Sequence, residues 1–160
     1  MSSGGIPACS TSALSTMMIG EVCVTSEGRQ ALYAGSYNGK HLVTAQSNSS
    51  DGAQWGCNGT SLGASSITDG KFNTARIVAS CAEIGRAAHI CRAIGSEWFL
   101  PARGQLDFIK NQAFALKMRM DVGFYWSSSE YDSGYGFGLI TNPDVKAKNS
   151  SNFVRCIREY

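Results

Sequence analysis

The stretch NTARIVASCAEIGRAAHICRAIG, from Asn73 to Gly95, holds the clearest periodic pattern in this sequence. Its apolar side chains recur every three to four residues, which is the spacing of one face of an α-helix. They are Ile77, Val78, Cys81, Ile84, Ala88, Cys91 and Ile94. Asn73 can cap the start of such a helix, and Gly95 stands where a left-handed C-terminal cap is expected. The pattern predicts one helix whose two cysteines face the interior, so that it is tied to two other parts of the chain.

A second helix is expected just after this stretch. Pro101 favours the first turn of a helix, and the residues that follow it carry apolar side chains at helical spacing. The predicted core face consists of Leu106, Ile109 and Ala113. Trp98 and Leu100, which precede the helix, are expected to lie in the core.

Short strand patterns flank the two helices. Residues 31–34 and 41–45 are apolar runs joined by Tyr37-Asn38-Gly39-Lys40, and Asn-Gly is a strong hairpin signal. Residues 124–126, 135–140 and 153–157 form three further runs. Strands, then two helices, then strands again indicate an α+β fold of short mixed or antiparallel strands rather than a doubly wound parallel sheet.

Length and charge narrow the class of protein. The 160 residues suit one domain, 1–160, of which residues 1–30 read as an N-terminal junction segment. A formal charge of +2 with scattered basic residues argues against nucleic acid as a partner. No apolar run approaches the roughly 18 residues of a membrane span, so no membrane insertion is expected. Residues 1–5 read like the edge of a longer polypeptide, and we expect an export signal upstream.

Six cysteines are spread over the whole chain. They are Cys9, Cys23, Cys57, Cys81, Cys91 and Cys156. No closely spaced pair of the CxxC kind is present, so three disulfides are favoured over a zinc site, and an oxidising compartment follows. Six cysteines allow about 15 pairings, among which a local Cys9–Cys23 loop is the simplest for the N-terminal pair.

Seven motifs follow one another from about residue 30 to the C-terminus. They are Gly39–Ala45, Gly52–Trp55, Asp69–Thr74, Ala87–Cys91, Trp98–Leu106, Tyr125–Glu130 and Val154–Arg158. In this order the sequence resembles the bacterial Lcl C-terminal-like domain, which is found at the ends of collagen-like adhesins, pilus-tip (PilV-like) proteins and phage fibre-type proteins. Trp-x-Leu-Pro followed by Trp-Ser-Ser and Val-Arg-Cys-x-Arg carries most of the likeness.

The resemblance implies a C-type-lectin-like fold over residues 31–158 and adhesion to cell-surface polysaccharide or lipopolysaccharide. It implies an extracellular place on the bacterial surface, with a pilus tip favoured over a phage fibre or a collagen-like adhesin. It also implies the disulfides Cys91–Cys156 and Cys57–Cys81. Ala102 departs from the family, which commonly has Ser there, and residues 131–151 match only in composition. Ligand specificity is expected in that unmatched segment.

The candidate ligand-binding residues lie in or beside this segment. They are Glu130, Tyr131, Asp132, Tyr135, Asn142, Asp144, Lys146 and Asn149. Exposed aromatic rings can stack on sugars, although the aromatic side chains of an alternating strand can also face the core. Both interpretations stay open for Tyr131 and Tyr135, and the core is favoured for Phe137. Lys146 and Lys148, with Arg103 and Arg119, could attract sulfated or phosphorylated polysaccharide, or be scattered surface charge.

No cofactor is expected, since a solvated polar loop is the default for the oxygen-bearing residues. Calcium is the alternative, because hard cations bind carboxylate and amide oxygens. No catalytic residue is expected either: Ser127 to Ser129 lack a Gly-x-Ser-x-Gly elbow, and only His41 and His89 could serve as a base. These serines are expected to bond the backbone.

A different class of function remains open, that of a structural cap that ends a fibre as a homo-oligomer such as a trimer. Its basis is the low charge and the small residues of the N-terminal segment. Arg155 and Arg158, near the C-terminus, are expected to be structural and to pair with Glu83 or Asp107.

Overall fold

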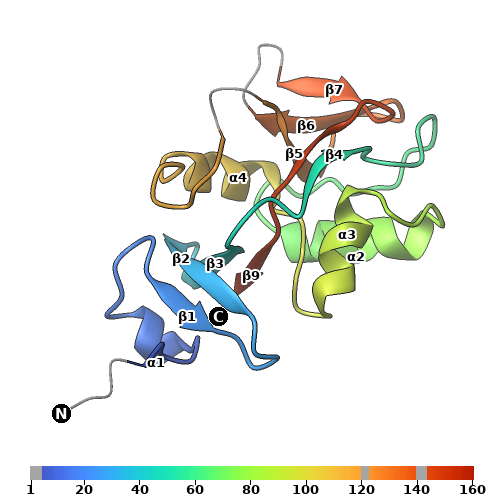
Figure 1. Cartoon of the computed structure of the whole chain (residues 1–160). Coiled ribbons are helices and arrows are strands. Elements are labelled where there is room, and N and C mark those ends of the chain that lie inside the picture. The colour runs from blue at the N-terminus through green and yellow to red at the C-terminus, as the bar shows by residue number, and fades with distance from the viewer. Residues whose placement is uncertain (1–4, 120–122, 140–143) are drawn as a thin grey trace.

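The computed structural model describes residues 5–119, 123–139 and 144–160, and over these residues the chain is α+β (Figure 1). The helices are α1 (Thr11–Leu14), α2 (Gly70–Ser80), α3 (Ala87–Ile94) and α4 (Arg103–Lys110). The strands are β1 (Val22–Val24), β2 (Gln30–Tyr37), β3 (Lys40–Ala45), β4 (Ser50–Ala53), β5 (Tyr125–Glu130), β6 (Tyr135–Leu139), β7 (Val145–Ala147), β8 (Asn152–Val154) and β9 (Ile157–Glu159). They form two sheets that are mostly antiparallel, which confirms the predicted α+β class of short strands and helices.

One end of the molecule is a four-stranded antiparallel sheet in the order β1-β2-β3-β9 (Figure 1). The turn between β2 and β3 has φ 49° at Asn38 and 76° at Gly39. Two successive residues in the left-handed region are what a tight hairpin turn of the favoured type requires, so the Asn-Gly hairpin is confirmed. The last strand, β9, pairs with β3 and closes the chain against this early hairpin.

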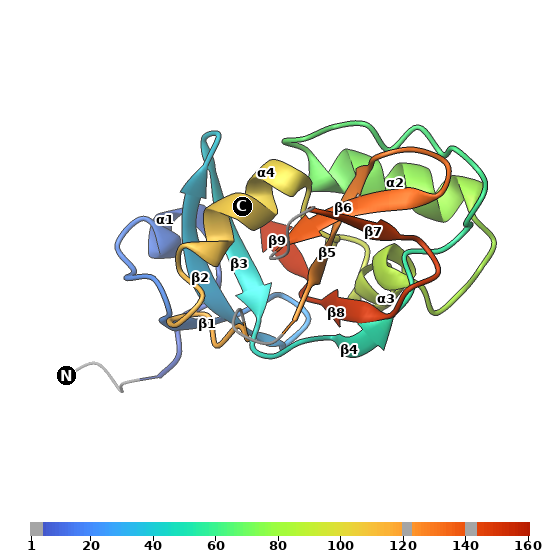
Figure 2. The same cartoon turned by 90° about the horizontal axis from the view of Figure 1, so that it is seen from above.

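The other end is a five-stranded sheet in the order β4-β8-β5-β6-β7. Helices α2 and α3 pack together beside it, and α4 lies between the two sheets in contact with β2, β5 and β6 (Figure 2). The strand β5 runs parallel to β8 and antiparallel to β6. This arrangement leaves β7 and one side of β6 at the surface.

Residues 153–157, predicted as one strand, contribute to two strands in different sheets. Arg155 lies between β8 and β9 and is 1% exposed. Its guanidinium donates hydrogen bonds to the carbonyl oxygens of Ala45, Leu116 and Lys117. A buried guanidinium needs such acceptors, and burial lowers the pKa of Arg155. The main-chain carbonyls therefore fix the chain where it crosses from one sheet to the other.

The ion pairs predicted for the two C-terminal arginines are wrong. Arg158 pairs instead with Glu27, with 2.7 Å between Nη1 and Oε1. Burial opposes ionisation of Glu27, but hydrogen bonds from Arg158, the Trp98 indole and a serine outweigh it and hold its pKa at about 2. Glu83 and Asp107 pair with cations of their own segments.

The single helix predicted over residues 73–94 is also wrong, because residues 81–86 separate α2 from α3. Cys81 leaves the helical conformation, with φ −121° and ψ 114°, and its sulfur is bonded to Cys57. Gly85 then turns the chain with φ 75°. Ile84, whose spacing fitted one helix, is 86% exposed. Helical periodicity could not reveal this break because Cys81 is buried in either arrangement.

The ends of these helices differ from the prediction as well. Asp69 caps α2 through a carboxylate oxygen that accepts the N–H of Phe72 at 2.9 Å. Asn73 is buried inside the first turn, where its side-chain amide bonds both the N–H and the carbonyl of Ser66. Gly95 is extended, with φ 172°, and is not a left-handed cap.

The helix expected after Pro101 is present as α4. Leu106 and Ile109 are buried as predicted, whereas Ala113 lies beyond the end of the helix and is only partly buried. The turn that follows the helix contains Leu116, which is fully buried and whose carbonyl accepts a hydrogen bond from Arg155.

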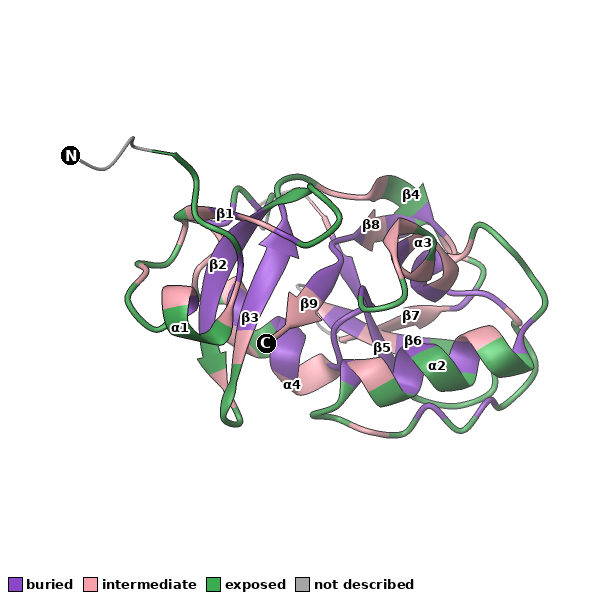
Figure 3. Ribbon diagram, turned by 90° about the horizontal axis from the view of Figure 1, so that it is seen from below, coloured by how far each residue is buried: buried purple, intermediate pink, exposed green. Residues whose placement is uncertain are grey.

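The core contains all three tryptophans, Trp55, Trp98 and Trp126, each 1% exposed or less. Leu100 is fully buried beside them, so the prediction that Trp98 and Leu100 belong to the core is confirmed. Figure 3 shows buried residues along the strands and on the inward faces of the helices. Over the described residues, no helix is long and apolar enough to cross a membrane.

The three disulfides join Cys9 to Cys23, Cys57 to Cys81 and Cys91 to Cys156, as predicted. The first closes the N-terminal segment onto β1. The second ties the loop after β4 to the end of α2, and the third ties α3 to the segment between β8 and β9. The bridges therefore join the N-terminal segment, the end of α2 and α3 to three different parts of the chain.

Candidate functional site

The two faces of strand β6 differ in chemistry, since successive side chains point to opposite sides of a strand. Gly136 and Gly138 face the interior. A Cβ at Gly136 would lie 2.9 Å from Cδ1 of Trp55, and one at Gly138 would lie 2.2 Å from the carbonyl oxygen of Tyr125. Only glycine fits so close to the core. The opposite face carries Tyr135, Phe137 and Leu139.

Three aromatic side chains gather on this outer side: Tyr131, Tyr135 and Phe137, which we call the aromatic face. Tyr131 is 57% exposed and Tyr135 45% exposed. The ring of Tyr131 meets that of Phe137 edge-on, with 5.2 Å between centroids. The Arg103 guanidinium lies 4.2 Å from the centroid of the Phe137 ring. Of the two interpretations open for the tyrosines, the surface one holds. The core position predicted for Phe137 is wrong, because its ring is half-buried on the outer face between Tyr131 and Arg103.

The turn before Tyr135 is held by Asp132. Its carboxylate accepts the N–H groups of Gly134 and Tyr135 at 2.8 and 2.9 Å. The N–H of Gly59, in the loop after β4, also donates to the carbonyl of Ser133 at 2.8 Å. The tyrosines therefore stand on a turn whose backbone is bonded on two sides, which limits the conformational entropy they lose on binding.

Glu130, at the end of β5, helps to hold the hairpin of β5 and β6 in place. Its side chain is 6% exposed and its Oε2 lies 2.6 Å from Nζ of Lys148, which has no exposed surface. The same carboxylate accepts the N–H groups of Leu62 and Gly63. The Lys148 ammonium also donates to the carbonyl of Thr60 at 2.9 Å. Both charges are thus paired inside the protein and neither is presented to a ligand, contrary to the expectation for both residues.

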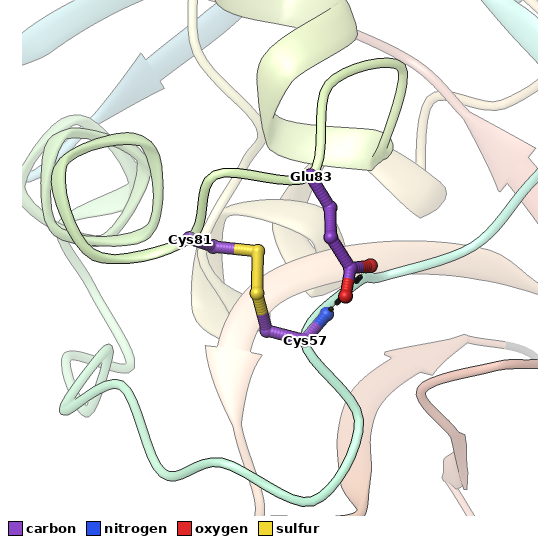
Figure 4. A group of neighbouring side chains, drawn as sticks. All are labelled: Cys57, Cys81 and Glu83. Atoms are coloured by element: carbon purple, nitrogen blue, oxygen red, sulfur yellow. Dashed lines mark hydrogen bonds between the residues drawn. A yellow bond between two sulfur atoms is a disulfide. The ribbon is translucent and has the colours of Figure 1, made fainter.

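The loop that Glu130 binds is anchored by the Cys57–Cys81 disulfide (Figure 4). Glu83 lies next to the bridge, and its carboxylate accepts the N–H of Cys57 at 3.1 Å and the Nε–H of Arg86 at 3.0 Å. Cys57, Cys81 and Glu83 are residue types that can hold a metal ion, but the sulfurs of the two cysteines are bonded to each other. The disulfide and the Glu83 carboxylate therefore hold in place the loop after β4, which supports the aromatic face.

Two of the three serines of β5 bond the backbone through their hydroxyls, as predicted, whereas the Ser128 hydroxyl accepts from the Asn73 side-chain amide at 3.3 Å. Ser127 to Ser129 are at most 1% exposed. The Ser127 hydroxyl donates to the carbonyl of Phe137, and the Ser129 hydroxyl donates to that of Ser66, both at 2.8 Å. They join β6 and the loop before α2 to the central strand.

A cleft of about 460 Å³ opens beside the aromatic face. It is lined by Ile67, Arg103, Gly104, Asp107, Lys110, Leu139 and Asp144. Arg103 pairs with Asp144 across the cleft, and Lys110 pairs with Asp107 along α4 at 2.7 Å. Through Arg103, which also covers Phe137, the cleft and the aromatic face form one continuous surface.

The remaining candidates are dispersed. Lys146 is opposite Gly136 in the ladder, hence on the inner side of the sheet, and its ammonium lies 5.4 Å from the centroid of the Phe124 ring. Asn149 is exposed in the turn after β7. Asn142 lies outside the described residues. The candidates brought together are Tyr131, Asp132, Tyr135 and Asp144.

The carboxylates of the candidate set do not converge on one point within the described part of the chain. Glu130 binds Lys148, Asp132 binds its own turn, and Asp144 binds Arg103. Each is satisfied by protein donors, so calcium gains no support from their geometry.

A larger hollow of about 650 Å³ lies at the far side, between the β1–β2 turn, the segment after β3 and α3. Its lining includes Ile90, Ile94 and Arg29. Sequence reasoning missed both this hollow and the cleft. One feature of the sequence indicates the cleft, namely the glycine, Gly104, that directly follows Leu-Pro-Ala-Arg. In the structure a Cβ at Gly104 would lie 2.5 Å from the hydroxyl oxygen of Tyr37.

Comparison with models of protein families finds no family that matches this chain, and a search of curated proteins finds no match.

Proposed function

We propose that this chain is an extracellular receptor-binding domain of Lcl-like, C-type-lectin-like type that recognises cell-surface glycan, such as the sugars of lipopolysaccharide, at the tip of a pilus. The observation that carries the proposal is the aromatic face. Two tyrosines stand exposed on a turn that Asp132 and Gly59 hold in place.

Tyrosine suits a sugar ligand for a physical reason. The ring offers an apolar face to the C–H groups of a pyranose, and its hydroxyl can bond the sugar or water. Tyrosine also loses little conformational entropy on binding, because it has only two side-chain torsions. The polar cleft beside the aromatic face supplies the hydrogen-bonding groups that stacking lacks.

The three disulfides support the extracellular part of the proposal, because such bridges persist in oxidising compartments. The pilus tip rests on the likeness of the motifs to Lcl-type domains.

The test is binding of the oxidised domain to purified lipopolysaccharide immobilised on a biosensor. Loss of a stacked ring weakens binding by about 1 kcal/mol, so Tyr131→Ala with Tyr135→Ala is expected to weaken it by more than about tenfold. Phe72→Ala is the matched control, because Phe72 is an equally exposed aromatic on α2. Unchanged binding in the tyrosine variant, with parental thermal stability, would remove the site assignment.

A second function, a structural cap that oligomerises at a fibre end, is favoured by a different surface. Met18 is 73% exposed and Phe114 99% exposed. Their segments meet at Gly20, where a Cβ would lie 3.2 Å from that of Ala115. Exposed apolar side chains that gather in this way mark interaction surfaces.

The cap function predicts a trimer or other homo-oligomer in solution. Light scattering on the parent and on Met18→Ser with Phe114→Ser tests it. A parent oligomer that becomes a monomer in this variant, while lipopolysaccharide binding is absent in both, would favour the cap. A monomeric parent would remove it.

A further inference from the structure

We infer that the cleft lined by α4, Leu139 and Asp144 is a subsite for a neutral hexopyranose that presents two adjacent hydroxyl groups. This inference rests on the proposed function, whose aromatic face would hold the neighbouring part of the same glycan. It adds a site that the aromatic residues alone do not define, and it specifies the chemistry of the sugar.

Size and position fit one sugar residue at the end of an extended ligand. The cleft volume of about 460 Å³ lies in the range of roughly 300–1,000 Å³ found for small-molecule sites. Ile67 and Leu139 supply apolar wall for the C–H face of a ring. Arg103 joins the cleft to the aromatic face, since its guanidinium lies 4.2 Å from the Phe137 ring centroid.

The charges of the cleft are balanced. Arg103 pairs with Asp144, and Lys110 pairs with Asp107, so each cation already has a carboxylate partner. The side chains of the first pair are 41% and 36% exposed, and those of the second 38% and 59% exposed. All four are therefore reachable from solvent, and the cleft offers donors and acceptors side by side without net charge.

Adjacent sugar hydroxyls match such a pair. One hydroxyl can donate to the Asp144 carboxylate while its neighbour accepts from the Arg103 guanidinium, because carboxylate only accepts and guanidinium only donates. Binding in this way leaves the ion pair intact. An acidic ligand would have to replace Asp144 as the partner of Arg103, and the displaced carboxylate would then repel it.

Salt dependence separates the two classes of ligand. A neutral sugar held by hydrogen bonds is expected to bind with affinity that changes less than about twofold between 0.01 and 1 M NaCl, although the Debye length falls from about 30 to about 3 Å. An anionic polysaccharide attracted by net positive charge would weaken steeply over the same interval.

The experiment is a titration of the ¹⁵N-labelled, oxidised chain followed by two-dimensional NMR. The probes are the methyl glycosides of glucose, galactose and mannose, with glucuronic acid and glucose 6-phosphate as acidic counterparts. At least one neutral glycoside is expected to shift the Gly104 amide and the Arg103 Nε–H saturably. Loss of a hydrogen bond to a charged group predicts that Asp144→Asn weakens this binding by about tenfold. Glu97→Gln is the matched control, because it removes a carboxylate from an exposed ion pair on another face.

Three results would overturn the inference. Neutral glycosides could shift the amides of Tyr131 and Tyr135 but not Gly104, in which case the cleft fails and the aromatic face stands. The acidic sugars could bind more tightly than the neutral ones with steep salt dependence. Asp144→Asn, folded by its own spectrum, could bind like Glu97→Gln. Failure of the proposed function is a separate result, namely lipopolysaccharide binding that is indifferent to the two tyrosines.

Discussion

Replacing Glu130 by Gln should destabilise the protein more than the loss of one charge from an exposed ion pair, because Glu130 is the buried partner of Lys148. The substitution keeps the shape of the side chain and an oxygen that can accept the N–H groups of Leu62 and Gly63. It removes the negative charge that faces Lys148. The Lys148 ammonium has no exposed surface, so it would stay buried beside the Thr60 carbonyl and the Trp55 ring without the carboxylate that pairs with it.

The size of the effect follows from the burial of the pair. Removing one partner of a buried ion pair typically lowers the free energy of unfolding by about 3–5 kcal/mol, because the other charge is left without compensation. For a chain of this length that corresponds to a fall in Tm of about 10 °C. Lys148→Met in the same chain removes the stranded charge, so the double variant should regain about half of the loss.

Urea unfolding with the disulfides intact, followed by tryptophan fluorescence, measures these differences, since all three tryptophans are in the core. The matched control is Glu97→Gln, which breaks the exposed pair with Lys71 and should change stability by less than about 1 kcal/mol. If Glu130→Gln stays within about 1 kcal/mol of the parent, or if the double variant is worse than the single one, then the structural role assigned to Glu130 is mistaken.

Three other predictions concern the support of the site and the rest of the fold. Gly138→Ala should lower stability by about 1–3 kcal/mol in a thermal melt, because its Cβ would meet Tyr125 and Phe124. Gly134→Ala should be neutral, because its Cβ would make only ordinary van der Waals contacts, the nearest at 3.6 Å from Asn58 Oδ1, and equal effects of the two variants would contradict the assigned inner face of β6. Variants in which both cysteines of one bridge are replaced by Ser should lose stability in the order of loop length, because a longer closed loop removes more entropy from the unfolded chain. The separations of 14, 24 and 65 residues predict losses of about 3 kcal/mol for Cys9–Cys23, about 3.5 for Cys57–Cys81 and about 4 for Cys91–Cys156. Urea midpoints in the reverse order would count against this explanation. The lowered pKa of Glu27, about 2, means that its contribution is fully present above about pH 4.5 and is lost as the pH falls toward 2. Because the Glu27–Arg158 pair is partly exposed, its contribution to the free energy of unfolding is at most about 1 kcal/mol. Glu27→Gln should therefore flatten the curve of stability against pH between about pH 2 and 4.5, and an unchanged slope there would contradict the assignment.

Local chemistry made part of the fold predictable. Asn38-Gly39 fixes a hairpin turn wherever it stands between two strand patterns, and Pro101 with its following apolar spacing fixes the start of α4 closely. The Cys9–Cys23 loop was the simplest local pairing. The other two disulfides could not be derived from spacing, and their prediction depended on the resemblance to Lcl-type domains.

The rest depended on contacts between distant residues. The break after α2 comes from the bond between Cys81 and Cys57, 24 residues apart, and no periodicity records it. Glu130 read as a surface acid because its partner Lys148 stands 18 residues further on and reaches it only in the folded sheet. The cleft combines residues from the loop before α2, from α4 and from the end of β6, so no single stretch of sequence displays it.

Alternation explains why the aromatic residues could be proposed but not placed. The sequence from Tyr135 to Leu139 alternates glycine with larger side chains, and either set could face the core. The structure places the glycines inward because Trp55 and Phe124 fill the space that their side chains would need. Those bulky partners come from other segments, which a reading of β6 alone does not include.

Lectin-type adhesion is tested most directly by an array of bacterial lipopolysaccharides and neutral oligosaccharides, probed with the oxidised domain in calcium and in chelator. The proposal predicts binding to a defined set of sugars that survives chelation and is lost in Tyr131→Ala with Tyr135→Ala but not in Phe72→Ala. A folded sample that binds nothing in either condition would contradict glycan recognition and leave the fibre cap as the function to pursue.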